Sequence, residues 1–371
     1  MKIGIDARNL VHNVTGIGRY VLEMCHQLAE TGNEIFLYLP EKPMSELSRL
    51  SGATFRISSH AGNVRRMIWA QTMLPQQAVR DKIDVFWGPA HRLPFNLDPH
   101  IPRVVTIHDL VWHHAASTMR LRGWFGDRFL MQPALFSSDE IVTVSRSTAD
   151  AVRTLYPSVS KKLRVVYPGL TSLGDGGTSS VLADNGIDRD YALFVGTLEP
   201  RKNLRNLLEA YALLPEPVRK NLLLVIAGGQ GWRLGDLRGQ MVRLKIESDV
   251  RLTGYVTDSD LAVLYRRAKM LTMPSLYEGF GFPIIEANAV GVPALTSNVS
   301  SMPEVAGEAA LLVDPTNIQD ISNAMGRLAL DNTLRSRLAE KAPVNALRFS
   351  WKKSASELVA VFESAMAVRK G

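Results

Sequence analysis

The 371-residue sequence contains a single cysteine, and this scarcity excludes several classes of protein. Cys25 has no second thiol with which to form an intrachain disulfide, and it cannot supply a zinc module built on cysteines. No apolar run approaches the roughly 18 residues that a membrane-spanning helix needs. Residues 1–6 turn polar too soon for a signal peptide. We therefore expect a cytoplasmic protein without disulfides.

Histidine is absent from the second half of the chain. All eight histidines lie within residues 1–170, and so does most of the net charge of +7. That part has 20 Lys and Arg against 14 Asp and Glu, whereas residues 171–371 have 23 against 22. A basic surplus in one half favours an anionic partner for that half, such as a phosphorylated substrate, a nucleic acid or a membrane face.

The length and the pattern of apolar residues predict two α/β domains. A chain of 371 residues is long enough for two buried cores. Short β-branched runs alternate with longer helical patterns, which is typical of βαβ units around doubly wound parallel sheets. We expect strands at 2–5, 34–39, 54–57, 85–87, 103–107, 140–144 and 163–166, and then at 191–195, 222–227, 250–252, 270–273, 293–296 and 310–313.

Composition also marks the domain boundaries. Residues 171–180 are rich in glycine and serine and lack apolar periodicity, which indicates a flexible linker. Residues 351–368 form an amphipathic helical pattern. We expect a Rossmann-like N-terminal domain at 1–170, a linker at 171–186, a Rossmann-like C-terminal domain at 187–345, and a C-terminal helix within 346–371 that returns to the first domain.

The most informative segment is 274–287, which follows an expected strand and leads into a helix. Gly279 and Gly281 let the backbone approach a ligand closely, and the helix start behind them offers free N–H groups to an anion. Glu278 lies in the loop and Glu286 about one turn into the helix. Each carboxylate can accept bonds from a pair of sugar hydroxyls. The segment predicts a site for a phosphorylated, hydroxyl-rich ligand.

A second strand-loop-helix junction places two cations together. Arg201 and Lys202 stand where the next helix is expected to begin, and cations at that end of a helix are disfavoured by its dipole. An anion between them and the N–H groups removes this conflict, which indicates a diphosphate site. A third junction, with Gly254 and Tyr255, is placed to offer backbone groups to a nucleobase.

These motifs carry a resemblance to a known family. The segment from Glu278 to Glu286, the GTLEPRKN loop, the VIAGG strand end at 225–229 and the TGIGRY loop at 15–20 resemble the retaining family 4 glycosyltransferases of GT-B fold. The resemblance covers essentially the whole chain. It is strongest to the bacterial branch that adds mannose or a related sugar to O-antigen and other surface polysaccharides.

The resemblance implies roles for individual residues. Glu286 would hold the nucleotide ribose, Glu278 would contact the donor sugar, and the cation pair would neutralise the donor diphosphate. Many members carry an arginine where this chain has Thr197. In this chain, neutralisation of the diphosphate therefore rests on Arg201 and Lys202. The expected nucleotide and diphosphate contacts are Gly16, Gly18, Arg201, Lys202, Gly254, Tyr255, Gly279, Phe280, Gly281 and Glu286, and the expected catalytic residues are His108, Glu278, Arg201 and Lys202.

Two features of the first half bear on the reaction. The glycines of the TGIGRY loop are followed by Val21 where a dinucleotide fingerprint needs a third glycine, which disfavours NAD binding and a dehydrogenase. By the resemblance, this loop faces the donor diphosphate. His108 follows a buried strand at the edge where open α/β sheets bind ligands, and the resemblance places it beside the donor sugar.

No metal site is expected. His113 and His114 lack carboxylates or cysteines at ligand spacing. Two D-x-D triplets occur, at 188–190 in the exit of the linker and at 258–260, which has the pattern of a helix N-cap. Neither follows a strand end, so we expect metal-independent transfer that uses the nucleotide-sugar as a substrate and needs no cofactor.

Two segments of the first half mix cations with large apolar residues, at 65–69 and 119–131. This pattern fits a helix on an anionic bilayer or a groove for a lipid-linked acceptor, with the enzyme peripheral on the inner face of the cytoplasmic membrane. It fits core-facing helices with solvated arginines equally well, and both interpretations stay open here.

The resemblance implies transfer of a hexose from a GDP-sugar onto a lipid-linked or oligosaccharide acceptor, in bacterial surface polysaccharide (O-antigen) synthesis. The hexose would be mannose or a related sugar. The nucleotide would bind the second domain and the acceptor the first. The alternatives are a UDP-sugar-dependent glycosyltransferase and a nucleotide-sugar epimerase of similar architecture. A nucleic-acid-binding protein would explain the basic half but not the Glu278 and Glu286 loop, so we expect no nucleic acid partner.

Overall fold

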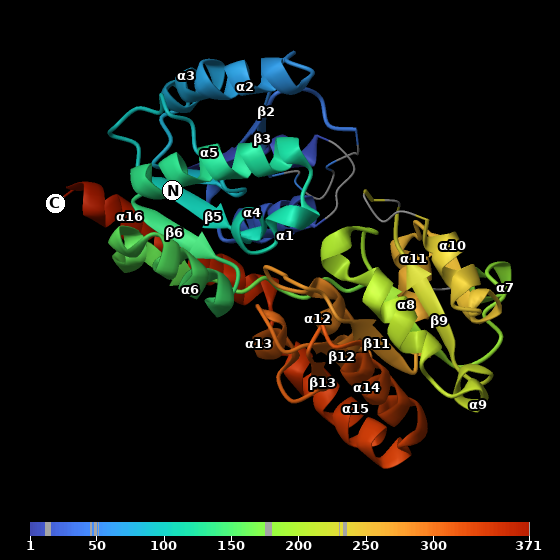
Figure 1. The fold of residues 1–371 in the computed structure, drawn as a ribbon. Helices are drawn as coiled ribbons and strands as arrows, with labels where there is room; N and C mark the ends of the chain where they lie inside the picture. The colour runs from blue at the N-terminus through green and yellow to red at the C-terminus, as the bar shows by residue number, and fades with distance from the viewer. Residues whose placement is uncertain are drawn as a thin grey trace. The chain divides into compact units, whose positions relative to one another are not determined.

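Two all-parallel sheets organise the chain in the computed structural model, which describes residues 1–11, 16–44, 47, 50, 52–174, 180–229, 231–232 and 236–370. The chain divides into two compact units. Unit 1 contains Met1–Trp112, Leu121–Gly169 and Phe349–Gly371, and unit 2 contains His113–Arg120 and Leu170–Arg348. Each unit is built on its own sheet (Figure 1). The expected doubly wound α/β fold is confirmed.

Unit 1 has a seven-stranded sheet in the order β3-β2-β1-β4-β5-β6-β7. Its strands are β1 (Lys2–Asp6), β2 (Glu34–Leu39), β3 (Thr54–Ile57), β4 (Val85–Gly88), β5 (Arg103–Ile107), β6 (Glu140–Thr143) and β7 (Leu163–Val165). Its helices are η1 (Arg8–Leu10), α1 (Ile17–Glu30), α2 (Asn63–Gln71), α3 (Met73–Arg80), α5 (Leu121–Ser137), α6 (Arg146–Leu155), η4 (Pro157–Lys162) and α16 (Trp351–Lys370), and α4 (Val111–His114) begins in this unit.

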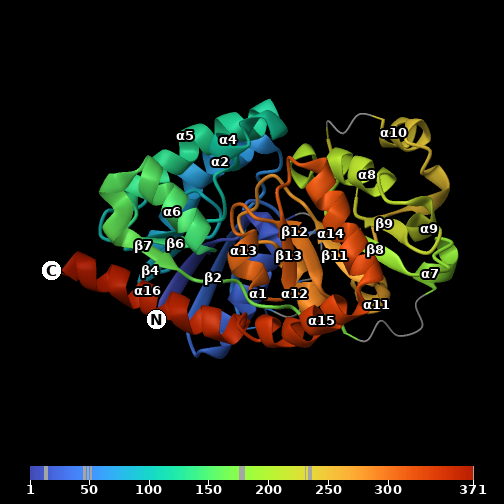
Figure 2. The same ribbon diagram turned by 60° about the horizontal axis from the view of Figure 1, so that its bottom comes forward.

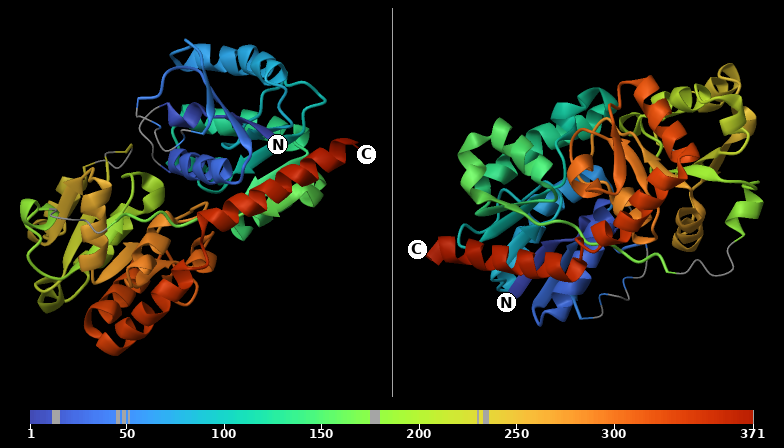
Figure 3. Two further views of the ribbon diagram at one scale, coloured as in Figure 1. Left: turned by 180° about the vertical axis from the view of Figure 1, so that it is seen from behind. Right: turned by 90° about the horizontal axis from the view of Figure 1, so that it is seen from below.

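The last helix of the chain belongs to unit 1. Helices α1 and α16 pack against each other, and α16 also contacts β4, β5 and β6 (Figures 1 and 3). Since parallel crossovers are right-handed, α2, α3 and α5 lie on the opposite face of the sheet from α1. The packing at the start of α16 is tight: a Cβ on Gly169 would lie 2.1 Å from the Trp351 nitrogen. Ser364 Oγ donates to Glu140 Oε1 over 2.6 Å further along the helix.

Unit 2 has a six-stranded sheet in the order β10-β9-β8-β11-β12-β13. The strands are β8 (Tyr191–Val195), β9 (Leu223–Ala227), β10 (Val250–Gly254), β11 (Met270–Met273), β12 (Ala294–Ser297) and β13 (Ala310–Val313). The helices are η3 (Ala116–Thr118), α7 (Val181–Asp184), η5 (Pro200–Lys202), α8 (Leu204–Ala212), α9 (Glu216–Arg219), α10 (Leu237–Arg243), η6 (Glu247–Asp249), α11 (Asp258–Arg267), α12 (Phe282–Ala289), α13 (Met302–Ala306), α14 (Ile318–Leu330) and α15 (Asn332–Ala346).

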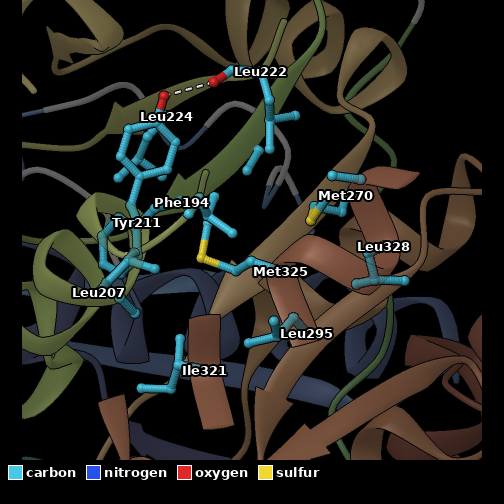
Figure 4. Packing of buried hydrophobic residues seen from close by; sticks show 14 of the residues in the cluster. Phe194, Leu207, Tyr211, Leu222, Leu224, Met270, Leu295, Ile321, Met325 and Leu328 are labelled. Atoms are coloured by element: carbon cyan, nitrogen blue, oxygen red, sulfur yellow. Dashed lines mark hydrogen bonds between the residues drawn. The ribbon is translucent and has the colours of Figure 1, made fainter. Parts of the chain in front are cut away.

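The core of unit 2 lies between its sheet and helices α8 and α14. Phe194 and Leu224 of the sheet pack with Leu207 and Met325 of these helices in one buried cluster (Figure 4). The hydroxyl of Tyr211 donates to Leu222 O over 2.6 Å, so this large side chain is buried with its polar atom satisfied. Helices α11 and α12 lie on the other face of the sheet (Figure 2).

The expected linker at 171–186 contains a short helix. Residues 180–186 contain α7, which contacts α11, and Arg251 Nε donates to Gly186 O over 3.1 Å. Residues 175–179 of the expected linker lie outside the described residues. Near the other boundary, α15 ends at Ala346 and unit 1 resumes at Phe349.

Candidate active site

Two loops meet at the point where the strand order of unit 2 reverses. Strands β8 and β11 are neighbours, with Leu193 paired to Leu271, although about 80 positions of the chain separate them. In open α/β sheets, ligands bind at the carboxyl ends of the strands at such a reversal. The loop after β8 carries Arg201 and Lys202, and the loop after β11 carries Glu278. The topology therefore brings together the two motifs that the sequence singled out.

Glu278 lies between the two cations. Lys202 Nζ donates to Glu278 Oε1 over 2.7 Å, and Arg201 bonds the other oxygen of the same carboxylate. The Arg201 guanidinium also donates to Tyr277 O over 2.9 Å and pairs with the carboxylate of Glu199. All these side chains are buried or nearly so. Two cations and two carboxylates thus form one compact ion-pair cluster.

The cluster sets the charge state of Glu278. Burial opposes ionisation of this carboxyl, but the positive charges of Arg201 and Lys202 outweigh burial and lower its pKa to about 2. Glu278 is therefore a carboxylate at any physiological pH. A carboxylate offers about four acceptor positions, and the two cations occupy one on each oxygen. The remaining positions are suited to hydroxyl donors.

The structure changes the explanation for the cation pair. Arg201 and Lys202 lie in η5, one residue before α8, and Asn203 between the two elements has a left-handed φ of 63°. From the sequence, a diphosphate is expected as the anion that balances the two cations. In the structure, the carboxylates of Glu199 and Glu278 compensate the two cations, because the folded chain brings β11 beside β8. The two carboxylates therefore balance the two positive charges within unit 2.

The loop around Glu278 is held by residues that the sequence analysis did not identify. Ser301 Oγ donates to Phe280 O over 2.7 Å and lies 3.0 Å from Glu278 O. Ser300 Oγ accepts from Glu278 N over 3.2 Å. On the other side, Asn203 Nδ2 donates to Pro274 O over 2.9 Å. These residues follow other strands, so no local pattern marks them.

The glycine loop leads into α12 as the sequence predicted. Gly281 has a φ of 112° and precedes the first helical residue, Phe282, with Pro283 in the first turn. A side chain there would be strained by the backbone angle and would crowd Met273, since a Cβ would lie 3.3 Å from its Cε. Phe280 is buried. Glycine at position 281 is therefore what allows the chain to turn from the loop into α12.

Glu286 is buried on α12 and is oriented by a tyrosine. Tyr265 of α11 donates its hydroxyl to Glu286 Oε2 over 2.7 Å. Tyr265 is fully buried and Glu286 is only 7% exposed, so this bond lies in a region of low dielectric. No sequence motif marks Tyr265, which lies on another helix, 21 positions before Glu286.

The strand ends next to the cluster pack backbone against backbone. A Cβ on Gly228 would lie 1.9 Å from Gly196 O, and Gly228 N donates to Gly254 O over 2.8 Å. Gly196 itself faces the Lys202 side chain, since its Cβ would lie 3.4 Å from Lys202 Cε. A row of glycines at the ends of β8, β9 and β10 thus connects Gly254 to the cation cluster. Tyr255, the residue after Gly254, is 79% exposed.

In unit 1, the expected residues lie at the carboxyl ends of β1 and β5. Gly16 is the N-cap of α1 with a φ of 47°, and Gly18 is buried in the first turn of this helix. Thr15 of the same motif lies outside the described residues. His108 directly follows β5 and is buried, and its Nε2 lies 2.7 Å from Pro89 O. Burial and the neighbouring His91 lower the pKa of His108 to about 3, so it is neutral at physiological pH.

The described residues contain no group of three or more His, Cys, Asp or Glu side chains placed to hold a metal ion. His113 and His114 pack ring against ring, and His114 stacks on Tyr277 of unit 2 with centroids 5.2 Å apart. Asp260 forms a capping box with Thr257, so the triplet at 258–260 opens α11. Thr257, rather than a residue of the triplet, is the N-cap.

The mixed cationic and apolar segments fold as α2 and α5. Trp69 is an exception to the proposed surface role, because it is fully buried and donates to Ser58 Oγ over 3.0 Å. Val64, Met67 and Ile68 of α2 are exposed, as are Phe125 and Phe129 of α5, which stack on each other 6.0 Å apart. Among the described residues, no helix is long and apolar enough to cross a membrane.

Comparison with known proteins identifies the family. The model of glycosyl transferases group 1 matches residues 183–344, and that of glycosyltransferase family 4 matches residues 14–171. The O-antigen chain mannosyltransferase B of Escherichia coli is 31% identical over 391 residues, which cover 98% of this chain and all of that protein.

Solved structures agree on the fold. Sucrose-phosphate synthase from Thermosynechococcus elongatus superposes with a TM-score of 0.75 at 18% identity, covering 99% of this chain and 100% of that one. Anabaena HepE, solved with UDP and glucose, has a TM-score of 0.75 at 16% identity, covering 98% and 100%. The resemblance inferred from the motifs is confirmed: this chain belongs to glycosyltransferase family 4 and is a glycosyltransferase of GT-B fold.

Proposed function

We propose that this glycosyltransferase transfers a mannosyl residue, or a closely related hexosyl residue, from a GDP-sugar during synthesis of a bacterial surface polysaccharide. The ion-pair cluster of Arg201, Lys202 and Glu278 carries the chemical part of the proposal. The sugar and the pathway are supported by the similarity to the E. coli O-antigen mannosyltransferase along nearly the full length of both chains.

The donor binds at the β8 and β11 strand ends of unit 2. Arg201 and Lys202 contact the diphosphate, while Glu278 accepts hydroxyls of the donor sugar through positions that the cations leave open. Glu286, held by Tyr265, accepts the ribose hydroxyls. Gly279, Phe280 and Gly281 provide backbone around the phosphates, and Gly254 and Tyr255 contact the base.

The reaction retains the anomeric configuration. The bond from the sugar C1 to the diphosphate oxygen breaks, the acceptor hydroxyl oxygen bonds to C1 on the same face, and the leaving diphosphate takes the hydroxyl proton. Arg201 and Lys202 stabilise the negative charge that grows on the leaving group. No side chain acts as a covalent nucleophile, and neither a metal ion nor a cofactor takes part.

His108 of unit 1 contributes an uncharged acceptor. A carbonyl oxygen only accepts hydrogen bonds, so the ring nitrogen next to Pro89 O must carry the proton. Nδ1 is then unprotonated, and we assign it to a hydroxyl of a sugar substrate.

The acceptor is a lipid-linked saccharide bound by unit 1, and the enzyme works on the inner face of the cytoplasmic membrane. Exposed apolar side chains of α2 and α5, including Ile68, Phe125 and Phe129, support this proposal, as does the basic surplus of residues 1–170. Phe125 and Phe129 stack on each other yet remain 52% and 61% exposed, so together they leave an apolar surface open to a partner.

Thermal-shift titration with GDP, UDP and ADP, followed by their sugar forms, tests the donor. A ligand at 100 times its Kd adds about 2.7 kcal/mol to the free energy of unfolding of the part that binds it. We expect GDP and GDP-mannose to raise the melting temperature most. A larger shift with UDP would instead favour the UDP-sugar alternative. Release of a free, isomerised sugar from the donor without acceptor would favour the epimerase.

A further inference from the structure

The turn at 88–92, which follows β4, holds His108, which follows β5. Strands β4 and β5 are neighbours in the sheet of unit 1, so the turn at 88–92 lies beside His108. The turn is tightly constrained: a Cβ on Gly88 would lie 2.2 Å from Arg92 O. His91 has a left-handed φ of 62°, which is unfavourable for a residue with a Cβ. A non-glycine residue at such an angle needs compensating contacts.

Three hydrogen bonds join this turn to the end of β5. His91 N donates to Thr106 O over 2.9 Å. His108 N donates to His91 Nε2, also over 2.9 Å. His108 Nε2 donates to Pro89 O over 2.7 Å. The two histidines are each buried, and their ring centroids lie 5.5 Å apart. The backbone and the ring of His108 are thus both held by the same turn.

These bonds determine where the protons lie on both rings. His91 Nε2 receives a backbone N–H, so it must be unprotonated, and neutral His91 carries its proton on Nδ1. His108 Nε2 faces a carbonyl oxygen and must carry the proton. Nδ1 is therefore the ring nitrogen of His108 that these bonds do not use, and it is an acceptor. The ring of Tyr20 packs edge to face on His108 with centroids 4.8 Å apart, which limits tilting of the imidazole.

We propose that His91 is a positioning residue for the transfer reaction: it holds His108 in the orientation and tautomer in which Nδ1 accepts a substrate hydroxyl. This inference rests on the role of His108 proposed above. His91 itself has both its backbone N–H and its Nε2 engaged within the turn, so it acts through His108.

A double-mutant cycle tests the proposal. His91→Phe keeps an aromatic ring and the Cβ at the strained position but removes the nitrogen acceptor, and we expect kcat/KM to fall at least 10-fold. His91→Gln places an amide oxygen near the position of Nε2 and should restore activity to within about 3-fold of wild type. In a His108→Ala background, His91→Phe should cost less than 2-fold, because its effect passes through His108. His100→Phe, at an exposed position, is the matched control.

A spectroscopic measurement is independent of activity. Imidazole ¹⁵N shifts should show His91 protonated on Nδ1 and His108 protonated on Nε2 in the wild type, and the His108 signals should move in His91→Phe. Three results would overturn the proposal. They are the opposite tautomers on the two rings, His108 signals that do not move in His91→Phe, and an equal fall in kcat/KM from His91→Phe in the wild-type and His108→Ala backgrounds. If His108→Ala is fully active, the role proposed for His108 fails instead, and the shifts still report whether His91 holds it. If His91→Phe does not fold, the wild-type tautomers and His91→Gln remain decisive.

Discussion

Lys202 Nζ lies 2.7 Å from Glu278 Oε1, although 76 positions of sequence separate the two residues. The contact forms because β8 and β11 are neighbours and both loops leave the sheet at its carboxyl edge. It places the cation that we propose for the leaving diphosphate within one hydrogen bond of the carboxylate that we propose for the donor sugar. The predictions below begin from this pair.

Lys202→Ala should lower kcat by about 100-fold or more, because it removes a charge that stabilises the leaving diphosphate. Arg201 still pairs with Glu278 in this variant, so we expect the far-UV circular dichroism spectrum to be unchanged. Lys220→Ala, which breaks an exposed ion pair with Glu216, is the control and should retain full activity. A Lys202→Ala enzyme with nearly wild-type kcat would refute the assigned role.

Tyr265→Phe should raise the KM for the donor roughly 3- to 10-fold with little change in kcat. The variant loses the hydrogen bond that orients Glu286, and a bond to a charged group is worth about 1.5–3 kcal/mol. Tyr191→Phe is a matched control, since its buried hydroxyl donates to Leu264 O over 2.7 Å. Both variants should lose stability in urea unfolding, because each loses a buried hydrogen bond of a tyrosine hydroxyl. Equal donor KM values for the two variants would contradict the role of Glu286.

Glu278→Gln should change how stability depends on pH. The pKa of Glu278 is about 2 in the folded protein and near 4.5 when unfolded, so the unfolded state binds more protons between these values. The stabilisation by its ion pairs is therefore complete above pH 4.5 and is lost as the pH falls toward 2. It amounts to roughly 3 kcal/mol for this shift.

The measurement is the free energy of unfolding at pH 7 and at pH 3 to 4. The difference between wild type and Glu278→Gln should shrink on acidification. Glu308→Gln, at an exposed ion pair with Lys341, should show a small difference at both pH values. If the difference in free energy of unfolding between wild type and Glu278→Gln stays constant with pH, the cations do not stabilise the carboxylate of Glu278.

Phe125→Ser combined with Phe129→Ser should weaken binding to vesicles that contain anionic phospholipid at least 10-fold. Both side chains are exposed on α5, and burying a phenylalanine side chain contributes about 1.5–3 kcal/mol. The control combines Leu330→Ser with Leu347→Ser, two exposed apolar residues of unit 2. Co-sedimentation that does not depend on anionic lipid, or on these phenylalanines, would argue against a membrane-facing α5.

Local sequence pattern predicted the strands well. Buried parallel strands are short apolar runs, and β5, β8 and β11 have the bounds expected from their residues. The residues of the candidate site were also found where glycines and charges follow a strand directly, as at Glu278 and at Arg201. Trp69 shows the limit: Met67 and Ile68 before it on α2 face solvent, whereas the direction of Trp69 toward the core depends on the sheet beneath it.

The amino-acid sequence was enough to establish the class of fold, the family and the loops that carry the chemistry, because strand patterns and strand-to-helix junctions are local. Tertiary structure was needed to find the partners of those residues. Each of four residues bonds a segment that belongs to another element and lies beside it in the folded unit: His91, Tyr265, Asn203 and Ser301. It also showed that Glu278 pairs with Arg201 and Lys202, since strand order, rather than sequence order, decides which charges meet.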